Sequence, residues 1–140
     1  MTYPEYMIAP MRQDLARYGV EETRTPEEVD RLVSAENGTV LMIVNSVCGC
    51  AAGRARPAVG MALQHPVKPA KAGTVFAGGD VEAVSHLRAL LSPYPPSSPS
   101  MALFKNGKPV FMVHRHEIEQ RSPQQIAQIL TEAFDRFCAS

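Results

Sequence analysis

The segment TVLMIVNSV, from Thr39 to Val47, constrains the fold of this chain more than any other. β-Branched and apolar residues dominate it, and polar residues do not alternate with hydrophobic ones. Such a run predicts a central strand covered on both faces, because a strand with one solvated face shows alternation. A strand of this kind requires helices above and below it, so we expect a layered α/β domain.

The remaining elements are predicted from helical spacing of apolar residues, capping residues and turn signals. The order is ααβαβαββα, with parallel crossovers first and a hairpin last. In chain order the elements are a helix around Met11–Tyr18, a helix from the Thr25–Glu28 capping box, the Thr39–Val47 strand, a helix over Ala51–Leu63, a strand over Gly73–Ala77, a helix capped by Asp80, strands at Met101–Phe104 and Val110–Val113, and a helix from the Ser122–Gln125 capping box.

Proline and glycine mark the turns and breaks in this order. Asn106-Gly107 between two apolar runs predicts a tight hairpin. Pro109 cannot donate a hydrogen bond to a strand partner, so its strand is expected at a sheet edge. Pro57 is expected to kink the helix that contains it. The proline-rich stretch 93–99 is interpreted as a loop inside one domain, because only about 40 residues follow it.

Size and charge exclude several classes of protein. The 140 residues are interpreted as a single domain spanning 1–140. The 14 basic and 14 acidic side chains cancel, so no nucleic-acid partner is expected. The longest aliphatic run, Val40–Val44, is far too short to cross a membrane, so no membrane partner is expected either. The first residues do not resemble a signal peptide, and three cysteines are an odd number, so a cytoplasmic location is expected.

The pair Cys48-Gly49-Cys50 is the feature with chemical consequences. Cys48 follows the buried strand and Cys50 begins a helix, where free N–H groups and the helix dipole stabilise a thiolate. Arg54 and Arg56, within two turns, are expected to add to this effect. Because one residue separates the cysteines, a disulfide between them would be strained and therefore transient rather than structural. The pair thus favours thiol–disulfide exchange.

Two other interpretations of the cysteines remain open at this stage. Two buried cysteines could share this neighbourhood by chance. Alternatively, Cys48 and Cys50 could join His114 and His116 in a metal site for zinc or an iron–sulfur cluster, although the spacings match no zinc ribbon or finger. Cys138, close to the carboxyl end, is interpreted as a thiol of a frayed helix that is dispensable for the first exchange step. A part in thiol exchange or in intermolecular pairing is the alternative.

Five parts of the chain carry a resemblance to known proteins. They are VNSVCGCAAG at 44–53 with the following ARP at 55–57, YPEYM at 3–7, TPEEV at 25–29, YPPSSPS at 94–100 and EAFD at 132–135. These segments resemble the bacilliredoxins, a family of bacterial thioredoxin-like proteins. The similarity extends over nearly the whole chain, and the Cys-Gly-Cys form is specific to that family. In addition, the segment from Ser98 to Gly107 resembles the cis-proline strand and hairpin of thioredoxin.

The resemblance implies a fold and a reaction. The expected fold is thioredoxin-like, a central mixed four-stranded sheet flanked by helices, with an N-terminal helical extension. The family acts on mixed disulfides between protein cysteines and bacillithiol, so no bound cofactor is expected, with bacillithiol as co-substrate and bacillithiol-modified proteins as partners. Cys48 would attack the bacillithiol sulfur, and Cys50 or a second bacillithiol would resolve the product. A disulfide isomerase activity is a close relative of this reaction.

The resemblance also implies a substrate-binding surface beside the cysteines, formed by Gly49, Ser98 and Pro99. In thioredoxin-like folds the corresponding proline faces the active-site cysteine, and the backbone before it pairs with an extended substrate. We therefore expect a cis Ser98–Pro99 peptide bond that lies against Cys48. The proline ring would also keep a metal ion away from the thiolates.

Overall fold

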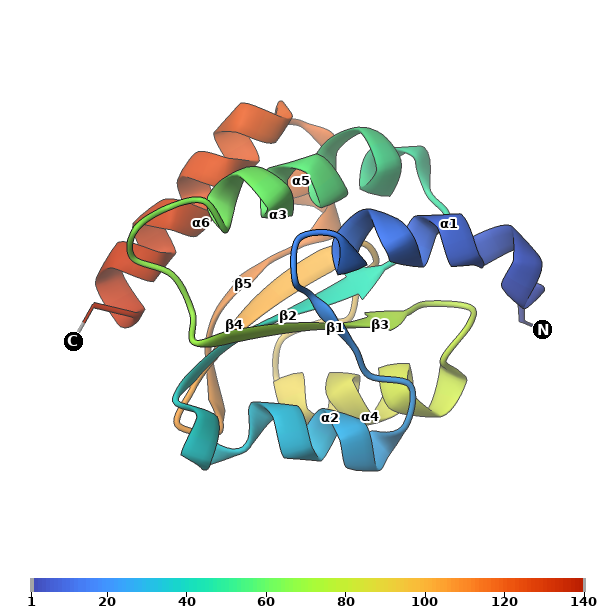
Figure 1. The fold of residues 1–140 in the computed structure, drawn as a ribbon, viewed down its shortest axis with the longest axis horizontal. Coiled ribbons are helices and arrows are strands. Elements are labelled where there is room, and N and C mark those ends of the chain that lie inside the picture. Colours follow the sequence, from blue (N-terminus) through green and yellow to red (C-terminus); the bar gives the residue numbers. More distant parts are fainter. Residues whose placement is uncertain (1, 140) are drawn as a thin grey trace.

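The computed structural model describes residues 2–139 and consists of a mixed five-stranded sheet with helices on both faces (Figure 1). The strand order is β1-β3-β2-β4-β5. The strands are β1 (Glu21–Glu22), β2 (Thr39–Asn45), β3 (Lys71–Phe76), β4 (Ser100–Lys105) and β5 (Lys108–Val113). The helices are α1 (Glu5–Ala16), α2 (Pro26–Val33), α3 (Arg56–Ala62), α4 (Val81–Leu91), α5 (Arg115–Glu119) and α6 (Pro123–Phe137), with a 3₁₀ turn at Ala35–Asn37 and a π-helical turn at Ala51–Ala55.

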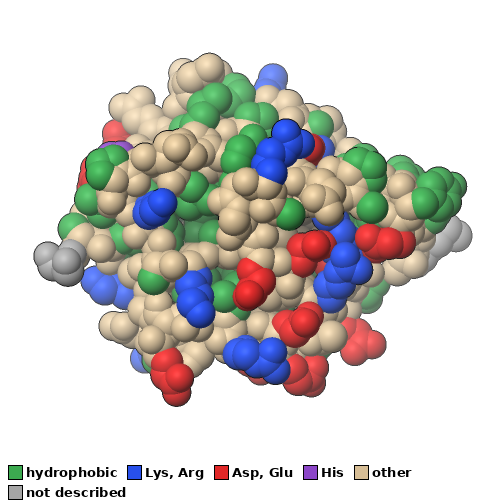
Figure 2. All heavy atoms as spheres, in the orientation of Figure 1, with side chains coloured by type: hydrophobic (Ala, Val, Ile, Leu, Met, Phe, Trp, Pro, Cys, Tyr) green, Lys and Arg blue, Asp and Glu red, His purple; other side chains and the backbone are tan. Residues whose placement is uncertain are grey.

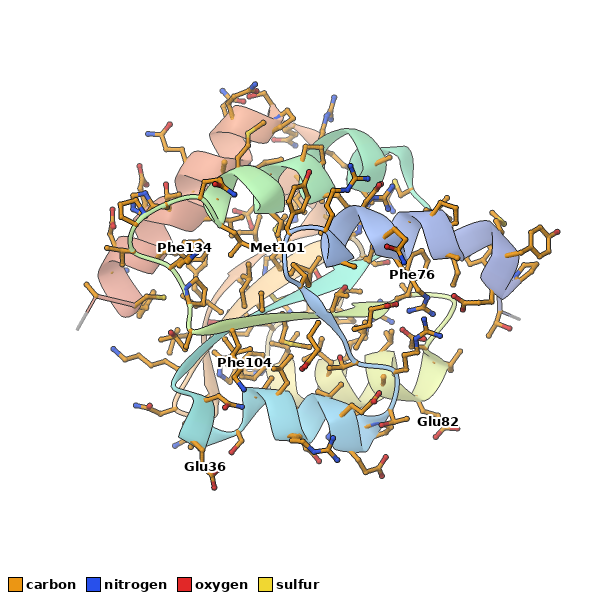
Figure 3. The ribbon with its side chains drawn as sticks, in the orientation of Figure 1. Glu36, Phe76, Glu82, Met101, Phe104 and Phe134 are labelled. Carbon is orange, nitrogen blue, oxygen red and sulfur yellow. The ribbon has the colours of Figure 1, made fainter. Side chains whose placement is uncertain are left out.

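The central strand is β2, as the apolar run predicts. It pairs in parallel with β3 and antiparallel with β4, and residues 40–45 are all buried. Alternate residues of β2 serve two separate hydrophobic cores. Leu41 and Ile43 pack with α3 and α6, whereas Met42 and Val44 pack with α2 and α4. Figure 3 shows Phe134 on the α6 side of the sheet and Phe104 on the side of α2 and α4.

The turn predictions hold in the structure. Asn106 and Gly107 have φ angles of 53° and 84°, the left-handed values that a two-residue hairpin requires. Strand β5, which contains Pro109, lies at the edge of the sheet. The Ser122 hydroxyl accepts a hydrogen bond from the Gln125 N–H, and the Gln125 side chain accepts one from the Ser122 N–H, which completes the expected capping box.

The predicted count of four strands is wrong because β1 adds a fifth. Two consecutive glutamates have low β propensity, so no local pattern marks Glu21 and Glu22 as a strand. Backbone pairing with β3 forms the strand instead. The following Thr23 extends it, since its N–H and its hydroxyl both donate to the Thr74 carbonyl. Helix α5, which the predicted order also lacks, is a short segment between β5 and α6.

The helix that follows the cysteines is irregular, but at a different place from the expected kink. Its first part, Ala51–Ala55, is π-helical, and regular α-helix begins at Arg56. Pro57 lies in the first turn of α3, where a missing N–H is tolerated. The irregularity therefore lies on the cysteine side of the proline. Single π-helical turns are rare and occur often at functional sites.

Asp80 occupies the N-cap position of α4, yet its side chain makes no capping hydrogen bond. Its carboxylate instead accepts two hydrogen bonds from Arg12 and one from the Phe76 N–H. Arg12 is 4% exposed and also contacts Glu5 and Glu22. This network joins α1 to the sheet and to the start of α4. Figure 2 shows acidic and basic side chains gathered where α1, β1 and α2 meet.

Four backbone segments meet at one end of the sheet, where the carboxyl ends of the parallel strands β2 and β3 lie. Parallel strands β2 and β3 end there, antiparallel β4 begins there, and β5 ends there before α5. This end of the sheet therefore brings together the Cys-Gly-Cys segment, the turn after β3, the Ser98-Pro99 segment and the start of α5 (Figure 1). Among the helices of residues 2–139, none combines the length and apolar character needed to cross a membrane.

Candidate active site

Cys48 and Cys50 lie at the end of β2, immediately before the π-helical turn. Their sulfur atoms are 2.8 Å apart without a disulfide bond, and both residues are partly exposed. The Cys48 carbonyl accepts hydrogen bonds from the Ala51 and Ala52 N–H groups, which fixes the start of the helical segment. The Cys48 N–H donates to the hydroxyl of the buried Ser46. The two thiols are thus held in contact at an accessible position.

Arg115 is the charged side chain that contacts the Cys48 sulfur. Its Nη2 donates to Cys48 Sγ at 3.2 Å, and its Nη1 donates to the Ser98 carbonyl at 3.1 Å. Its Nε lies 3.4 Å from Glu119 Oε1, one turn further along α5. The sequence interpretation missed this residue. The sequence does contain a signal for Arg115. Strand β5, the last strand of the hairpin, ends at the same end of the sheet as β2, and Arg115 follows it.

The two cysteines have opposite acidities. The pKa of Cys48 is lowered, first by the hydrogen bond from the Cys50 thiol, then by the Cys50 N–H, and further by the Arg115 charge. The pKa of Cys50 is raised, first by burial and then by the neighbouring Cys48. Since the thiolate is the nucleophile in disulfide exchange, this asymmetry favours Cys48 as the attacking group and Cys50 as its proton-bearing neighbour.

The expectation that Arg54 and Arg56 assist the thiolate is wrong. The Arg54 guanidinium donates to the Glu119 carbonyl. Arg56 is buried and binds Asp14, the Asn45 side chain and the Ser46 carbonyl. The π-helical turn and α3 direct both arginines toward these backbone and carboxylate groups, so the charge near Cys48 comes from a different part of the chain.

The Ser98–Pro99 segment lies directly before β4, at the end of the sheet where β2 ends. Its peptide bond is cis, as the sequence predicts, and a second cis bond precedes Pro93. Pro99 is buried, whereas Gly49 is exposed between the cysteines. Ser98 and Cys48 border the same surface hollow, and Arg115 bridges the Ser98 carbonyl and the Cys48 sulfur. Of the residues expected to bind substrate, Ser98 borders the same hollow as the nucleophile and Gly49 follows it in the chain.

Cys48, Cys50, His114 and His116, the four residues of the alternative metal site, are not gathered into one cluster in the structure. Within residues 2–139, no group of three or more His, Cys, Asp or Glu side chains is arranged to hold a metal ion. His114 and His116 stack on each other with their ring centres 5.7 Å apart. Because His116 lies in α5 rather than on a strand, the two histidines do not share a strand face that points at the cysteines.

Cys138 lies at the opposite end of the sheet from the other cysteines. Burial raises the pKa of its thiol, and Thr39 and Lys105 are the neighbours that act in the other direction. Thr39 begins β2, whereas Cys48 follows its end, so the two sites are separated by the length of that strand, about 20 Å.

We therefore expect the Cys138→Ser variant to retain the rate of the first exchange step within about twofold, because its thiol neither reaches nor polarises Cys48. Stopped-flow reduction of a model disulfide measures this rate. A loss as large as that of a Cys48→Ser variant would place Cys138 in the mechanism.

Comparison with known proteins agrees with this arrangement. The family model described as Disulphide isomerase matches residues 3–138. A bacilliredoxin from Koribacter versatilis is 49% identical over 138 residues, which cover 99% of this chain and 95% of the relative. The chain belongs to the bacilliredoxin family. A second bacilliredoxin, from Cytophaga hutchinsonii, is 50% identical over 133 residues and covers 95% of this chain and 98% of the relative.

Comparison with solved structures shows that this chain has the thioredoxin fold. The oxidised thioredoxin from Plasmodium falciparum superposes with a TM-score of 0.60 at 17% identity, covering 86% of this chain and 99% of that one. Thioredoxin from Fasciola hepatica gives a TM-score of 0.59 at 16% identity, covering 84% and 99%. The chain is therefore a bacilliredoxin-family member, of the thioredoxin-like oxidoreductase class, with the thioredoxin fold.

Proposed function

We propose that this bacilliredoxin reduces mixed disulfides between protein cysteines and bacillithiol, with Cys48 as nucleophile and Cys50 as resolving cysteine. The observation that carries the proposal is the opposite acidity of two thiols in contact: Cys48 is the better thiolate, and Cys50 donates to it at 2.8 Å. Bacillithiol as co-substrate comes from the family, whose curated members carry the name bacilliredoxin.

The proposed reaction proceeds by two exchange steps. The Cys48 thiolate attacks the bacillithiol sulfur, the mixed disulfide breaks, and the client leaves as a thiolate that takes up a proton. Cys48 then carries bacillithiol as a new disulfide. Either a second bacillithiol thiolate attacks the bacillithiol sulfur of this disulfide, or Cys50 attacks Cys48. The first route yields bacillithiol disulfide and free Cys48, and the second yields a Cys48–Cys50 disulfide and bacillithiol.

The substrate-binding part of the proposal assigns Gly49, Ser98 and Pro99 to the client chain. Gly49 is exposed and has no side chain, so a backbone can approach the thiolate closely from that side. The Ser98–Pro99 segment precedes β4 and lies beside the Cys48 hollow. An extended client segment would pair with the backbone before the proline while its modified cysteine faces Cys48.

The proposal is tested with one client protein modified separately by bacillithiol, glutathione and cysteine. Each form is mixed with the bacilliredoxin and the matching free thiol, and recovery of the client thiol is followed. We expect the bacillithiol form to be reduced fastest and a Cys48→Ser control to be inactive on all three. Equal rates on the three forms would contradict bacillithiol specificity while leaving the oxidoreductase class intact.

Replacing Arg115 with alanine is expected to shift the pH profile of exchange. The Arg115 charge lowers the pKa of Cys48, so its removal moves the rise of the rate with pH to higher pH. At neutral pH the rate should fall about twofold to fivefold, the size of a half-exposed charge interaction. At a pH above the pKa of Cys48 in both proteins the two rates should be equal, because Cys48 is then fully ionised in each.

The rate of alkylation of Cys48 by iodoacetamide between pH 5 and pH 10 measures this shift. Arg136→Ala, which removes an exposed arginine at the far end of α6, is the matched control and should leave the profile unchanged. An Arg115→Ala profile with the wild-type midpoint would contradict the role of Arg115.

Disulfide isomerisation is a second candidate activity, favoured by the description of the matching family model as Disulphide isomerase. The same geometry supports it, because Cys50 lies close enough to release Cys48 from a client with which it stays linked. Refolding of scrambled ribonuclease tests this activity. If Cys50→Ala fails to prolong the covalent complex with the client, this escape role of Cys50 is wrong.

A further inference from the structure

The Cys48 sulfur borders a surface hollow of about 410 Å³, which is large enough for a small-molecule thiol. Two arginines from different elements line it, Arg88 from the last turn of α4 and Arg115 from the start of α5. The wall also includes Tyr3 and Ser98. In the part of the chain that the structure describes, no acidic side chain lines this hollow.

The guanidinium of Arg88, which lines the hollow, has no partner among the residues that the structure describes. Within residues 2–139, its guanidinium makes no hydrogen bond or ion pair, and its Nε atom is buried without a partner. By contrast, the buried Arg12 is bound by Asp80 and Glu5, and Arg115 is held by Ser98, Cys48 and Glu119. A cation held at a partly buried position without an acceptor is costly unless a ligand or solvent supplies one.

The Tyr3 side chain forms another part of the wall of the hollow. Its N–H donates to the Gly78 carbonyl at 2.8 Å, which ties the N-terminal segment to the turn after β3. A Cβ added at Gly78, whose φ is 83°, would lie 2.6 Å from the Tyr3 ring, so the glycine lets the ring sit against this turn. The hollow is therefore bounded by the turn after β3, an aromatic ring and two cations.

We propose that Arg88 and Arg115 form a subsite for a carboxylate carried by the low-molecular-weight thiol whose disulfide Cys48 attacks. A planar guanidinium matches a carboxylate with two parallel hydrogen bonds, and Arg88 has its donors free. The proposal rests on the proposed function, since it concerns the small thiol that becomes attached to Cys48. It adds that the small thiol is selected by its negative charge.

The geometry favours a small ligand over an acidic client segment. Arg88 and Cys48 border one hollow of limited volume, so a carboxylate bound at Arg88 belongs to the molecule whose sulfur reaches Cys48. In the step itself the Cys48 thiolate forms a bond to one sulfur of the disulfide, the old S–S bond breaks, and the departing thiolate takes up a proton. The arginines take no part in this exchange of bonds and act by holding the ligand.

The test uses three symmetric disulfides of closely similar size that differ in charge. They are 3,3′-dithiodipropionate, which is anionic, 2-hydroxyethyl disulfide, which is neutral, and cystamine, which is cationic. Second-order rates with the 140-residue chain are measured for wild type and Arg88→Ala. We expect Arg88→Ala to react about fivefold more slowly with the anionic disulfide, at an unchanged rate with the neutral one, and at an equal or higher rate with the cationic one.

Two further variants separate the subsite from other effects. Arg88→Lys keeps the charge and should recover at least half of the lost anion preference, whereas Arg136→Ala removes a distant arginine and should change no rate. An equal loss on all three disulfides would overturn the proposal, because it would mean a damaged nucleophile or fold. No loss on the anionic disulfide would overturn it as well. The neutral disulfide reports on the Cys48 nucleophile alone, and the anionic disulfide reports in addition on the arginine subsite. Failure of the subsite proposal is therefore distinguishable from failure of the proposed function.

Discussion

The Cys48→Ser variant is expected to lose thiol–disulfide exchange by roughly three orders of magnitude or more, because a serine hydroxyl stays protonated at neutral pH and is a far weaker nucleophile than a thiolate. No other group at this site replaces it. Burial raises the pKa of Cys50 and persists in the variant, so Cys50 is a poor substitute for the Cys48 thiolate. Turnover of a bacillithiol-modified protein, with bacillithiol as the reductant, measures the loss.

Cys50 variants provide the comparison. Cys50→Ser keeps a donor beside the Cys48 sulfur and should retain the first exchange step, whereas Cys50→Ala removes the donor and should raise the pKa of Cys48. The alanine variant is therefore expected to be slower than the serine variant below the pKa of Cys48 and equal to it above. Comparable loss of the first step in Cys48→Ser and Cys50→Ser would contradict the assignment of the nucleophile.

The Arg12→Ala variant is expected to lose about 3 kcal/mol of unfolding free energy. Arg12 is 4% exposed, and its guanidinium neutralises the Asp80 carboxylate through two hydrogen bonds of 2.8 and 2.9 Å. Without Arg12, Asp80 remains as a buried charge whose hydrogen-bond partner is the Phe76 N–H. Breaking a buried ion pair from one side typically costs 3–5 kcal/mol. Urea denaturation followed by circular dichroism measures the change.

Arg17→Ala is the matched control, because it removes an arginine next to the same helix. Arg17 is 61% exposed and pairs with Asp14, so its loss should cost less than about 1 kcal/mol. The double variant Arg12→Ala/Asp80→Asn should be less destabilised than the sum of its two single variants, since removing both partners leaves no uncompensated charge. Equal midpoints for Arg12→Ala and Arg17→Ala would show that the Arg12 network contributes little.

The elements with strong local signals are predictable from sequence. The apolar run of β2 identifies the central strand, Asn106-Gly107 identifies the hairpin, and the Ser122–Gln125 box begins α6 where the structure has it. Each of these depends on neighbouring residues in the chain, so short-range patterns suffice. The position of Cys48 and Cys50 at a strand-to-helix junction follows from the same patterns.

The features that sequence reasoning missed depend on contacts between distant segments. Strand β1 exists through its pairing with β3, and the carboxylate of Asp80 binds Arg12, 68 residues away, rather than capping α4. Arg115 is 67 residues from Cys48 and reaches it because β5 and β2 end at the same end of the sheet. Local proximity pointed instead to Arg54 and Arg56, whose side chains bind other groups. Chain topology, which single-sequence patterns do not specify, decides which cation faces the thiolate.

The mass spectrum of the Cys50→Ser variant after mixing with a bacillithiol-modified protein tests the central claim most directly. With Cys50 absent and no free bacillithiol present, the reaction should stop after the first step. We predict a variant carrying one bacillithiol on Cys48, together with a client whose cysteine is reduced. A variant linked to the client instead, or bacillithiol that remains on the client, would contradict the account.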